Sequence, residues 1–185
     1  MAMPLVAHRF TVAEYHRMGE AGVFREDDRV ELIDGQVVEM SPIGPRHASC
    51  VRRLNWLLAR ALQDLAMIDV QNPVVLGEHD APQPDIALLK PRADAYPHHP
   101  GPLDVLLVIE VADTSAAYDR DVKIPRYARA GIPEAWLVDL PGDRVEVYRS
   151  PTGGRYAALT TIPRGATLGP LALPNVRLGS DEILG

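Results

Sequence analysis

The stretch DVLLVIEVAD, residues 104–113, constrains the fold more than any other part of the chain. Its apolar residues follow one another without alternation, which is typical of a strand buried on both faces. The same stretch carries Glu110 directly after the four apolar residues LLVI and before Val111. A buried carboxylate without a partner is costly, so Glu110 must be paired, protonated, bound to a metal or placed where the strand meets solvent. We expect the Glu110 carboxylate to lie at the end of the strand.

The length and composition indicate one folded unit. At 185 residues and 46% hydrophobic content, the chain is long enough for one full core and short for two. We expect a single domain over 1–185, with a core over about 10–150 and a C-terminal β extension over 151–185. The net charge of −6 provides no general attraction to nucleic acid or to an anionic membrane. A polyanionic ligand must then bind through local arginines or through metal ions.

Cysteine usage and hydropathy indicate a soluble intracellular protein. The single cysteine, Cys50, cannot form an intrachain disulfide, and no Cys/His spacing suggests a zinc site. Both features fit a reducing compartment, and we expect Cys50 to be a small core residue. No segment approaches the roughly 18 apolar residues of a membrane span. These features predict a cytoplasmic protein with no membrane partner.

Two elements are expected near the N-terminus. Segment 10–22 places Thr11 at an N-cap position with Glu14 three residues later, which predicts a short helix. Two alternating runs around Asp34-Gly35 predict a β-hairpin over 29–41. We expect the helix to be a lid or an edge element.

A longer amphipathic helix is expected over residues 46 to about 66. Its apolar side chains recur at helical spacing, as in a helix that packs on a sheet. Its polar side carries three arginines at seven-residue spacing: Arg46, Arg53 and Arg60. Their near alignment fits a ridge that faces phosphate groups. Solvated helix arginines are an equally open alternative.

The rest of the chain alternates strand-like runs with turns and one further helix. We expect a helix from about Asp119 to Ala130, with Pro125 near its start and Gly131 at its end. Strands are expected over 69–78, 83–90 and 104–113, and in the runs EAWLVDL, DRVEVYRS and RYAALTTI. Together these elements predict an α/β (α+β) fold, a mixed central β-sheet flanked by helices with an N-terminal β-hairpin.

Four charged residues fall in or beside these apolar runs, namely Glu31, Asp85, Glu110 and Lys123. Asp85 opens one expected strand and Glu110 closes another, so paired strands would bring both carboxylates within reach of one cation. Converging carboxylates repel each other unless a divalent ion neutralises them, and oxygen ligands suit Mg²⁺ or Mn²⁺. Each residue alone also fits a structural role. Glu110 would pair with an arginine, and Lys123 with Asp119 or Asp121 on the helix surface.

The order of these motifs resembles a known nuclease superfamily. The dipeptide PD, an apolar strand ending in Glu and a following helix with Lys are similar to the PD-(D/E)XK nucleases. More closely, RVELIDGQVVEMSPIGPRH, QPDIALL, VIEVADTS and DRDVKIPRYARAGIPEAWLVD resemble the Uma-type family of "putative restriction endonucleases" over about residues 10–150. The resemblance implies a restriction-endonuclease-like fold. It also implies a Mg²⁺- or Mn²⁺-dependent endonuclease that hydrolyses phosphodiester bonds in DNA.

The resemblance further implies roles for individual residues. Asp85 and Glu110 match the two acidic metal ligands, with the carbonyl of Val111 as a further ligand. Lys123 matches the catalytic lysine, displaced to the following helix because Ala112 occupies its usual place. Glu31 on the hairpin and His47 at the start of the first long helix match residues with accessory roles.

Three interpretations of function follow. In the first, a homodimeric nuclease uses Asp85 and Glu110 to hold Mg²⁺, while Lys123 positions the attacking water or offsets developing charge. In the second, a nuclease-like fold binds nucleic acid or a protein partner without cutting, as the acidic surface and the displaced lysine suggest. The third is hydrolysis of a small phosphate ester. Tyr127, four residues after Lys123, is expected to support packing.

Overall fold

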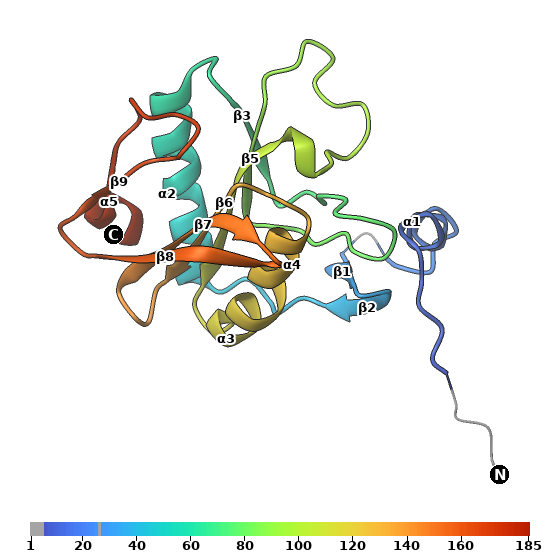
Figure 1. The fold of residues 1–185 in the computed structure, drawn as a ribbon. Coiled ribbons are helices and arrows are strands. Elements are labelled where there is room, and N and C mark those ends of the chain that lie inside the picture. The colour runs from blue at the N-terminus through green and yellow to red at the C-terminus, as the bar shows by residue number, and fades with distance from the viewer. Residues whose placement is uncertain (1–5, 26) are drawn as a thin grey trace.

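The structure is a computed structural model that describes residues 6–25 and 27–185. Its centre is a six-stranded sheet with the strand order β3-β4-β5-β6-β7-β8 (Figure 1). These strands are β3 Met67–Val70, β4 Ile86–Leu89, β5 Val105–Ala112, β6 Glu134–Asp139, β7 Arg144–Thr152 and β8 Arg155–Pro163. The other elements are α1 Val12–Glu20, β1 Val30–Ile33, β2 Gln36–Glu39, α2 Pro45–Leu62, the 3-10 helix η1 Pro102–Asp104, α3 Ala116–Tyr118, the π-helical turn η2 Asp119–Lys123, α4 Ile124–Arg129, β9 Thr167–Leu168, β10 Leu178–Gly179 and α5 Ser180–Leu184.

Strand β5 is an inner strand of the sheet, and its position determines where the candidate site residues can lie. It pairs antiparallel with β4 and parallel with β6, so the sheet is mixed, as expected. Glu110 lies opposite Leu137 of β6, and the strand continues through Val111 and Ala112. The prediction that Glu110 closes the strand is therefore wrong. Because Glu110 is only 3% exposed inside a central strand, its charge needs a partner from the protein or from a ligand.

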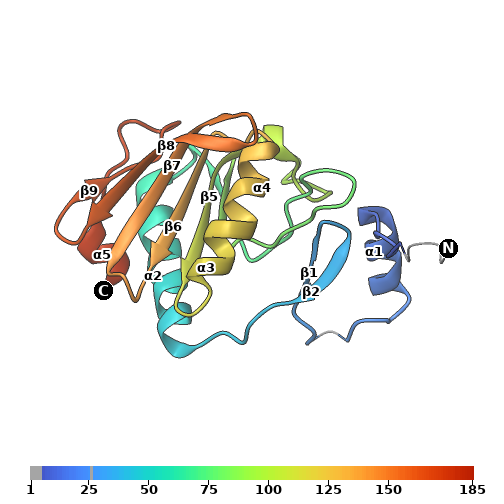
Figure 2. The same cartoon turned by 60° about the horizontal axis from the view of Figure 1, so that its bottom comes forward.

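Helices cover both faces of the sheet, with α2 on one side and α3 and α4 on the other (Figure 2). Side chains of β5 alternate between these faces. Leu107 and Ile109 join the core with α2, whereas Val108 and Ala112 join the core with α4. Glu110 has the same parity as Val108, so its side chain faces the side of η2 and α4. This alternation explains how a residue of the following helix can reach it.

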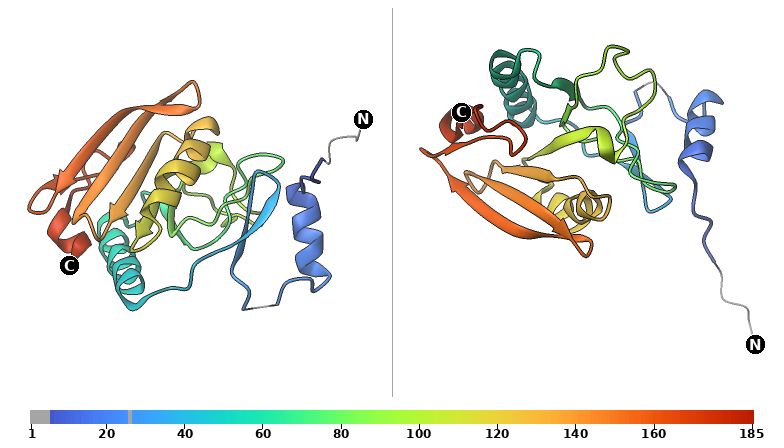
Figure 3. Two further views of the ribbon diagram at one scale, coloured as in Figure 1. Left: turned by 90° about the horizontal axis from the view of Figure 1, so that it is seen from below. Right: turned by 45° about the horizontal axis from the view of Figure 1, so that its top comes forward.

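The N-terminal helix and hairpin form a small unit beside the sheet (Figures 1 and 3). Helix α1 begins with the expected capping box between Thr11 and Glu14. Strands β1 and β2 pair antiparallel around the Asp34-Gly35 turn, as expected. Both turn residues have positive φ, which a tight two-residue hairpin requires. The unit has its own small buried cluster, made of Tyr15, Leu32 and Ala81.

Several expected elements have different bounds. The strand expected over 83–90 covers only Ile86–Leu89, so Asp85 lies just before that strand instead of opening it. The strand expected over 69–78 is shorter and shifted to Met67–Val70, because Gln71 adopts positive φ and Pro73 follows closely. The chain then runs without regular structure to β4, apart from one bridge between Leu32 and Ala81. The helix expected over 46–66 ends at Leu62, because Gln63 also has positive φ.

The arginines of α2 do not form a free ridge. Arg53 donates to the carbonyl oxygens of Ile183 and Leu184 and so attaches the C-terminal helix to α2. Arg60 lies over the ring of Trp56, with its Cζ 4.4 Å from the ring centre. Arg46, at the start of the helix, donates to Leu140 O at 2.7 Å and lies 3.4 Å from Asp113. Of the two interpretations left open for these arginines, the aligned phosphate-facing ridge is therefore not formed.

The helix expected over 119–130 begins earlier and contains a π-helical turn. Helical structure starts at Ala116 and runs through α3, η2 and α4 to Arg129. Pro125 consequently lies in the helix interior rather than near its start. Proline has no N–H to donate, and in the turn before it the Ile124 N–H donates to Asp119 O, five residues back. The wider turn accommodates the proline and changes the direction of the side chains that precede it.

The prediction that Cys50 is a core residue is confirmed. Cys50 is completely buried and belongs to the core between α2 and the sheet, as does Trp136. Within residues 6–25 and 27–185, no helix is long and apolar enough to cross a membrane.

Candidate active site

A cavity of about 460 Å³ lies where the hairpin, the start of α2, the strands β4 and β5 and the turn η2 meet. All the residues singled out from the sequence line it, namely Glu31, His47, Asp85, Glu110, Val111 and Lys123. They come from distant parts of the chain, so the fold brings the expected set together. Asp119 also lines the cavity and was not among the candidates from the sequence.

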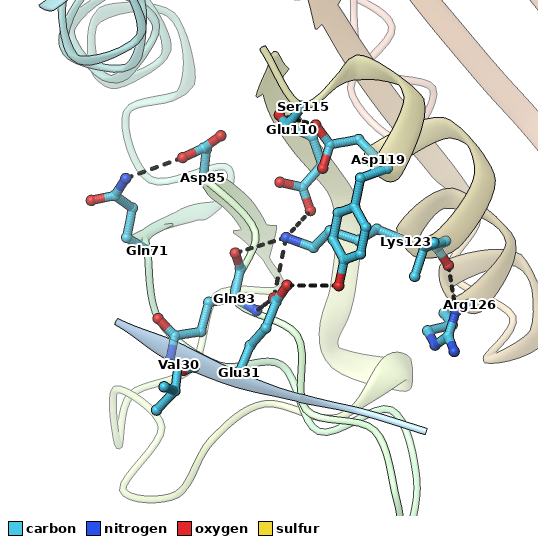
Figure 4. Close-up of polar contacts among 12 residues, drawn as sticks. Val30, Glu31, Gln71, Gln83, Asp85, Glu110, Ser115, Asp119, Lys123 and Arg126 are labelled. Carbon is cyan, nitrogen blue, oxygen red and sulfur yellow. Dashed lines mark hydrogen bonds and ion pairs between the residues drawn. The ribbon is translucent and has the colours of Figure 1, made fainter. Parts of the chain in front are cut away.

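Lys123 is at the centre of this group (Figure 4). Its Nζ lies 2.9 Å from Glu110 Oε1 and 3.3 Å from Glu31 Oε2, and it donates to the carbonyl oxygen of Gln83 at 3.1 Å. The residue is only 3% exposed. Pairing with Asp119 or Asp121 on the helix surface is therefore not its role. Burial alone would lower the pKa of Lys123, but Glu110 and Glu31 raise it, so the side chain is cationic.

Glu110 has a strongly perturbed carboxyl group. Its Oε1 accepts hydrogen bonds from Tyr127 and from Lys123. Burial raises the pKa of Glu110 to about 8, and the ammonium of Lys123 offsets part of that effect. The polar contacts that it makes with the described residues use only Oε1. Tyr127 packs in the core as expected, and it also holds this carboxylate in one orientation.

Asp85 and His47 form a second pair in the cavity. Asp85 Oδ2 lies 3.0 Å from His47 Nε2 and accepts the Val111 N–H at 2.9 Å, while Oδ1 accepts from Gln71. Burial would raise the pKa of Asp85, but the hydrogen bond and charge of His47 lower it below its usual value. The hydrogen bond with Asp85 correspondingly raises the pKa of His47. Asp85 is therefore an ionised carboxylate whose position is set by three donors.

Two residues of the helical segment contribute contacts that sequence reasoning missed. Asp119 is buried, and its Oδ2 accepts a hydrogen bond from Ser115 Oγ at 2.6 Å. Burial raises the pKa of Asp119 above its usual value. The hydroxyl of Tyr118 donates to Glu31 at 3.4 Å. The spacing of Asp119 four residues before Lys123 was a usable signal, since such residues share a helix face, whereas Tyr118, five residues before Lys123, gives no such signal.

The donor set fits a divalent cation that is held by two carboxylates. Within residues 6–25 and 27–185, no group of three or more His, Cys, Asp and Glu side chains is arranged as a metal site. These residues therefore form no metal site of three protein carboxylates. Mg²⁺, however, commonly binds through one or two carboxylates together with waters and substrate phosphates. Asp85 and Glu110, which both line the cavity, provide such a pair.

The charge balance of the cavity also favours a cation. Four buried carboxylates line the cavity, those of Glu31, Asp85, Glu110 and Asp119. When these groups, Lys123 and the half-buried His47 are ionised, two negative charges are in excess. Three further charged residues line the cavity and add one more negative charge, namely Arg29, Glu39 and Asp113. A divalent cation would offset this excess and lower the pKa of Glu110, which burial raises.

Comparison with known proteins places the chain in a family. A family model described as "Putative restriction endonuclease" and named Uma2 matches residues 12–180. The chain belongs to the Uma2 family. The resemblance identified from its motifs is thereby confirmed. The Uma2 match extends beyond the motif region, into the C-terminal segment that carries β9 and β10.

A solved structure confirms the fold that Uma2 membership implies. It is described as a "putative nuclease belonging to DUF820" from Anabaena variabilis ATCC 29413. The TM-score is 0.76 at 16% sequence identity, and the match covers 95% of this chain and 97% of that chain. No curated protein matches. The Uma2 description supports a nuclease, and the expected mixed sheet flanked by helices is the observed fold.

Proposed function

We propose that this Uma2 protein is a metal-dependent endonuclease that hydrolyses phosphodiester bonds in DNA. The position of Lys123 carries the proposal. Its ammonium lies 2.9 Å from Glu110, in the cavity that also contains Asp85, although it comes from the helix rather than from β5. Two acids and a lysine thus converge even though Ala112 occupies the usual lysine place. The description of the family as restriction endonucleases supports both the reaction and DNA as the substrate.

The metal would be Mg²⁺ or Mn²⁺, which when bound supplies Lewis-acid activation of the scissile phosphate and of water. Asp85 and Glu110 would hold it, with the carbonyl of Val111 as a further ligand. Asp85 is suited to this role because His47 and the Val111 N–H keep it ionised and oriented. Glu110 is suited because its contacts with the protein occupy one oxygen.

Lys123 would act on the charge that develops during the reaction. In hydrolysis, the oxygen of water bonds to phosphorus and the bond from phosphorus to one sugar oxygen breaks. Negative charge accumulates on the phosphoryl oxygens, and a nearby buried ammonium stabilises it. Glu31 holds the Lys123 ammonium from the side opposite β5 at 3.3 Å. Glu31 therefore acts as a positioning residue for Lys123.

Local arginines would bring the DNA backbone to an otherwise acidic protein. Arg29 lines the cavity. The side chain of Arg46 is 57% exposed and lies 3.4 Å from Asp113, which also lines the cavity. Arginine binds phosphate groups well because its planar donors match their oxygens. These two residues are the local cations that a polyanionic substrate requires here.

Two observations favour a second candidate function, a nuclease-like fold that binds nucleic acid or a protein without cutting. The described residues form no metal site of three or more ligands, and the three donor directions of Lys123 are taken by protein oxygens. A protein of this kind would bind DNA with the same arginines but leave its backbone intact.

Cleavage of supercoiled plasmid distinguishes the two functions. The wild type is incubated with plasmid in Mg²⁺, in Mn²⁺ and in EDTA, beside Asp85→Asn, which removes the charge of a proposed ligand. The matched control is Asp121→Asn, the same substitution at an exposed position of η2. We expect nicked and linear plasmid from the wild type and the control with metal. We expect none with EDTA or from Asp85→Asn.

Other results would support the binding function or would exclude Asp85 or the metal from the mechanism. Retarded but intact plasmid with the wild type in every condition supports the binding function. Cleavage by Asp85→Asn at the wild-type rate removes Asp85 from the mechanism. Cleavage that persists in EDTA removes the metal.

A further inference from the structure

Strand β8 (Arg155–Pro163) forms one edge of the central sheet, and this edge is open. The strand pairs with β7 only, and it lies at the outer rim of the molecule in the left view of Figure 3. Among the described residues, no backbone hydrogen bond joins 156–162 to any segment other than β7. One row of backbone N–H and C=O groups along this strand is therefore directed to solvent.

The composition of this edge is unusual for a strand that stays unpaired. Residues 156–162, with the sequence YAALTTI, contain no charge, no proline and no glycine. Proteins normally protect open edges with charged side chains, proline or bulges, because such edges pair with other strands. Here the charge and the proline stand outside the run, at Arg155, Pro163 and Arg164.

The opposite edge of the same sheet is protected in the usual way. Strand β3 has four residues, includes Asp69, and is half-buried along its whole length. Strand β8 has nine residues, and its middle, 157–161, is exposed. Leu159 at the centre is 57% exposed. The lack of protection is thus specific to β8.

Both ends of the β8 run are anchored, so the strand is already in the conformation that pairing needs. The hydroxyl of Tyr156 donates to Ile132 O at 2.9 Å, and the ring packs against the core with α4. At the other end, Ile162 packs against the core with α2. A rigid strand loses little conformational entropy when a second strand docks on it.

We propose that β8 is the surface through which two copies of this chain pair, antiparallel, to form one continuous twelve-stranded sheet across a two-fold axis. A second copy is the occupant because an antiparallel edge is complementary to itself under a two-fold rotation. An axis at Leu159 places the exposed leucines of both copies together and Arg155 opposite Pro163 of the second copy. No two arginines then face each other directly. The uncharged composition of the run suits an identical uncharged strand better than an acidic or basic partner.

The pairing does not depend on the chemistry of the acidic cavity, which lies beside β4 and β5, so the two proposals can fail separately. The first test is the mass of the full chain in solution, from sedimentation velocity over a range of concentrations. Leu159→Lys places like charges at the axis, and Leu103→Lys is the control because Leu103 is 86% exposed elsewhere on the surface. We expect dimeric wild type and control. We expect the dissociation constant of Leu159→Lys to rise at least about 100-fold, while its circular dichroism spectrum stays that of the folded wild type.

Cross-linking tests the register independently of stability. Leu159→Cys at a two-fold axis should oxidise rapidly to a covalent dimer, whereas Leu103→Cys should not. The natural Cys50 does not interfere, because it is buried and burial raises its pKa to about 11. A monomeric wild type overturns the proposal. So does a dimer that Leu159→Lys leaves intact, or a dimer in which Leu159→Cys fails to cross-link.

Discussion

Replacement of Lys123 by methionine tests the central electrostatic feature of the structure. Methionine keeps much of the volume of the side chain but removes the ammonium that lies between Glu110 and Glu31. Both carboxylates are at most 3% exposed, so neither gains solvent when the cation is lost. Removal of one partner from a buried ion pair typically costs about 3–5 kcal/mol.

The cost should depend on pH, with a sign that the structure determines. Because burial raises the folded pKa of Glu110 to about 8, well above its unfolded value of 4.5, the folded wild type keeps this proton at pH 7. Protonation relieves part of the repulsion, so we expect a loss near the lower limit, about 3 kcal/mol, at pH 7. Without Lys123 the folded pKa of Glu110 rises further. The loss should therefore grow above pH 8, where the wild type has released the proton and the variant has not.

Urea denaturation at pH 7 and pH 9 measures both effects. The control is Lys90→Met, because Lys90 is the other lysine of the chain and is exposed. That change should alter the free energy of unfolding by less than about 0.5 kcal/mol. A Lys123→Met variant as stable as the wild type, or a loss that is the same at both pH values, would refute this reasoning.

Three further predictions concern the neighbours of Lys123 in the cavity. The free energy of unfolding of the wild type should fall as pH rises from about 4.5 to 8, since the folded state keeps the Glu110 proton longer, and Glu110→Gln should remove this component in denaturation curves. His47→Gln should lose most stability between about pH 4 and 6.5. The lowered pKa of Asp85 stabilises the folded state above about pH 4, and the raised pKa of His47 stabilises it below about pH 6.5. An equal loss at pH 9 would contradict this prediction. Tyr127→Phe should weaken Mn²⁺ binding by about tenfold or more while the fold persists, and unchanged affinity in calorimetry would show that the Tyr127 hydroxyl does not orient Glu110 for the metal.

Much of the fold follows from short-range patterns in the sequence. The hairpin around Asp34-Gly35, the capping box of Thr11 and Glu14 and the buried strand at 104–113 all appear where the sequence predicts them. In each case the conformation that the local turn, cap or apolar run favours is also the conformation found in the folded chain. The chemical candidates also converge, because their order along the chain matches the Uma2 pattern.

The details that failed depend on long-range context. The helix pattern around Pro125 contains no sign of the π-helical turn, which changes the phase of the residues before it and directs Asp119 and Lys123 into one cavity. Likewise, burial of Glu110 inside β5 becomes tolerable only through Lys123 and Tyr127, which lie 13 and 17 residues later. The length of β3 is limited by the backbone at Gln71, which a pattern of apolar residues does not reveal.

The most direct test of a metal site shared by Asp85 and Glu110 is a calorimetric titration of Mn²⁺ into the wild type, Asp85→Asn and Asp121→Asn. We predict one saturable site per chain in the wild type and in Asp121→Asn. In Asp85→Asn the affinity should fall by at least about tenfold. Equal affinity in the wild type and Asp85→Asn, or no binding in any of the three proteins, would contradict the account.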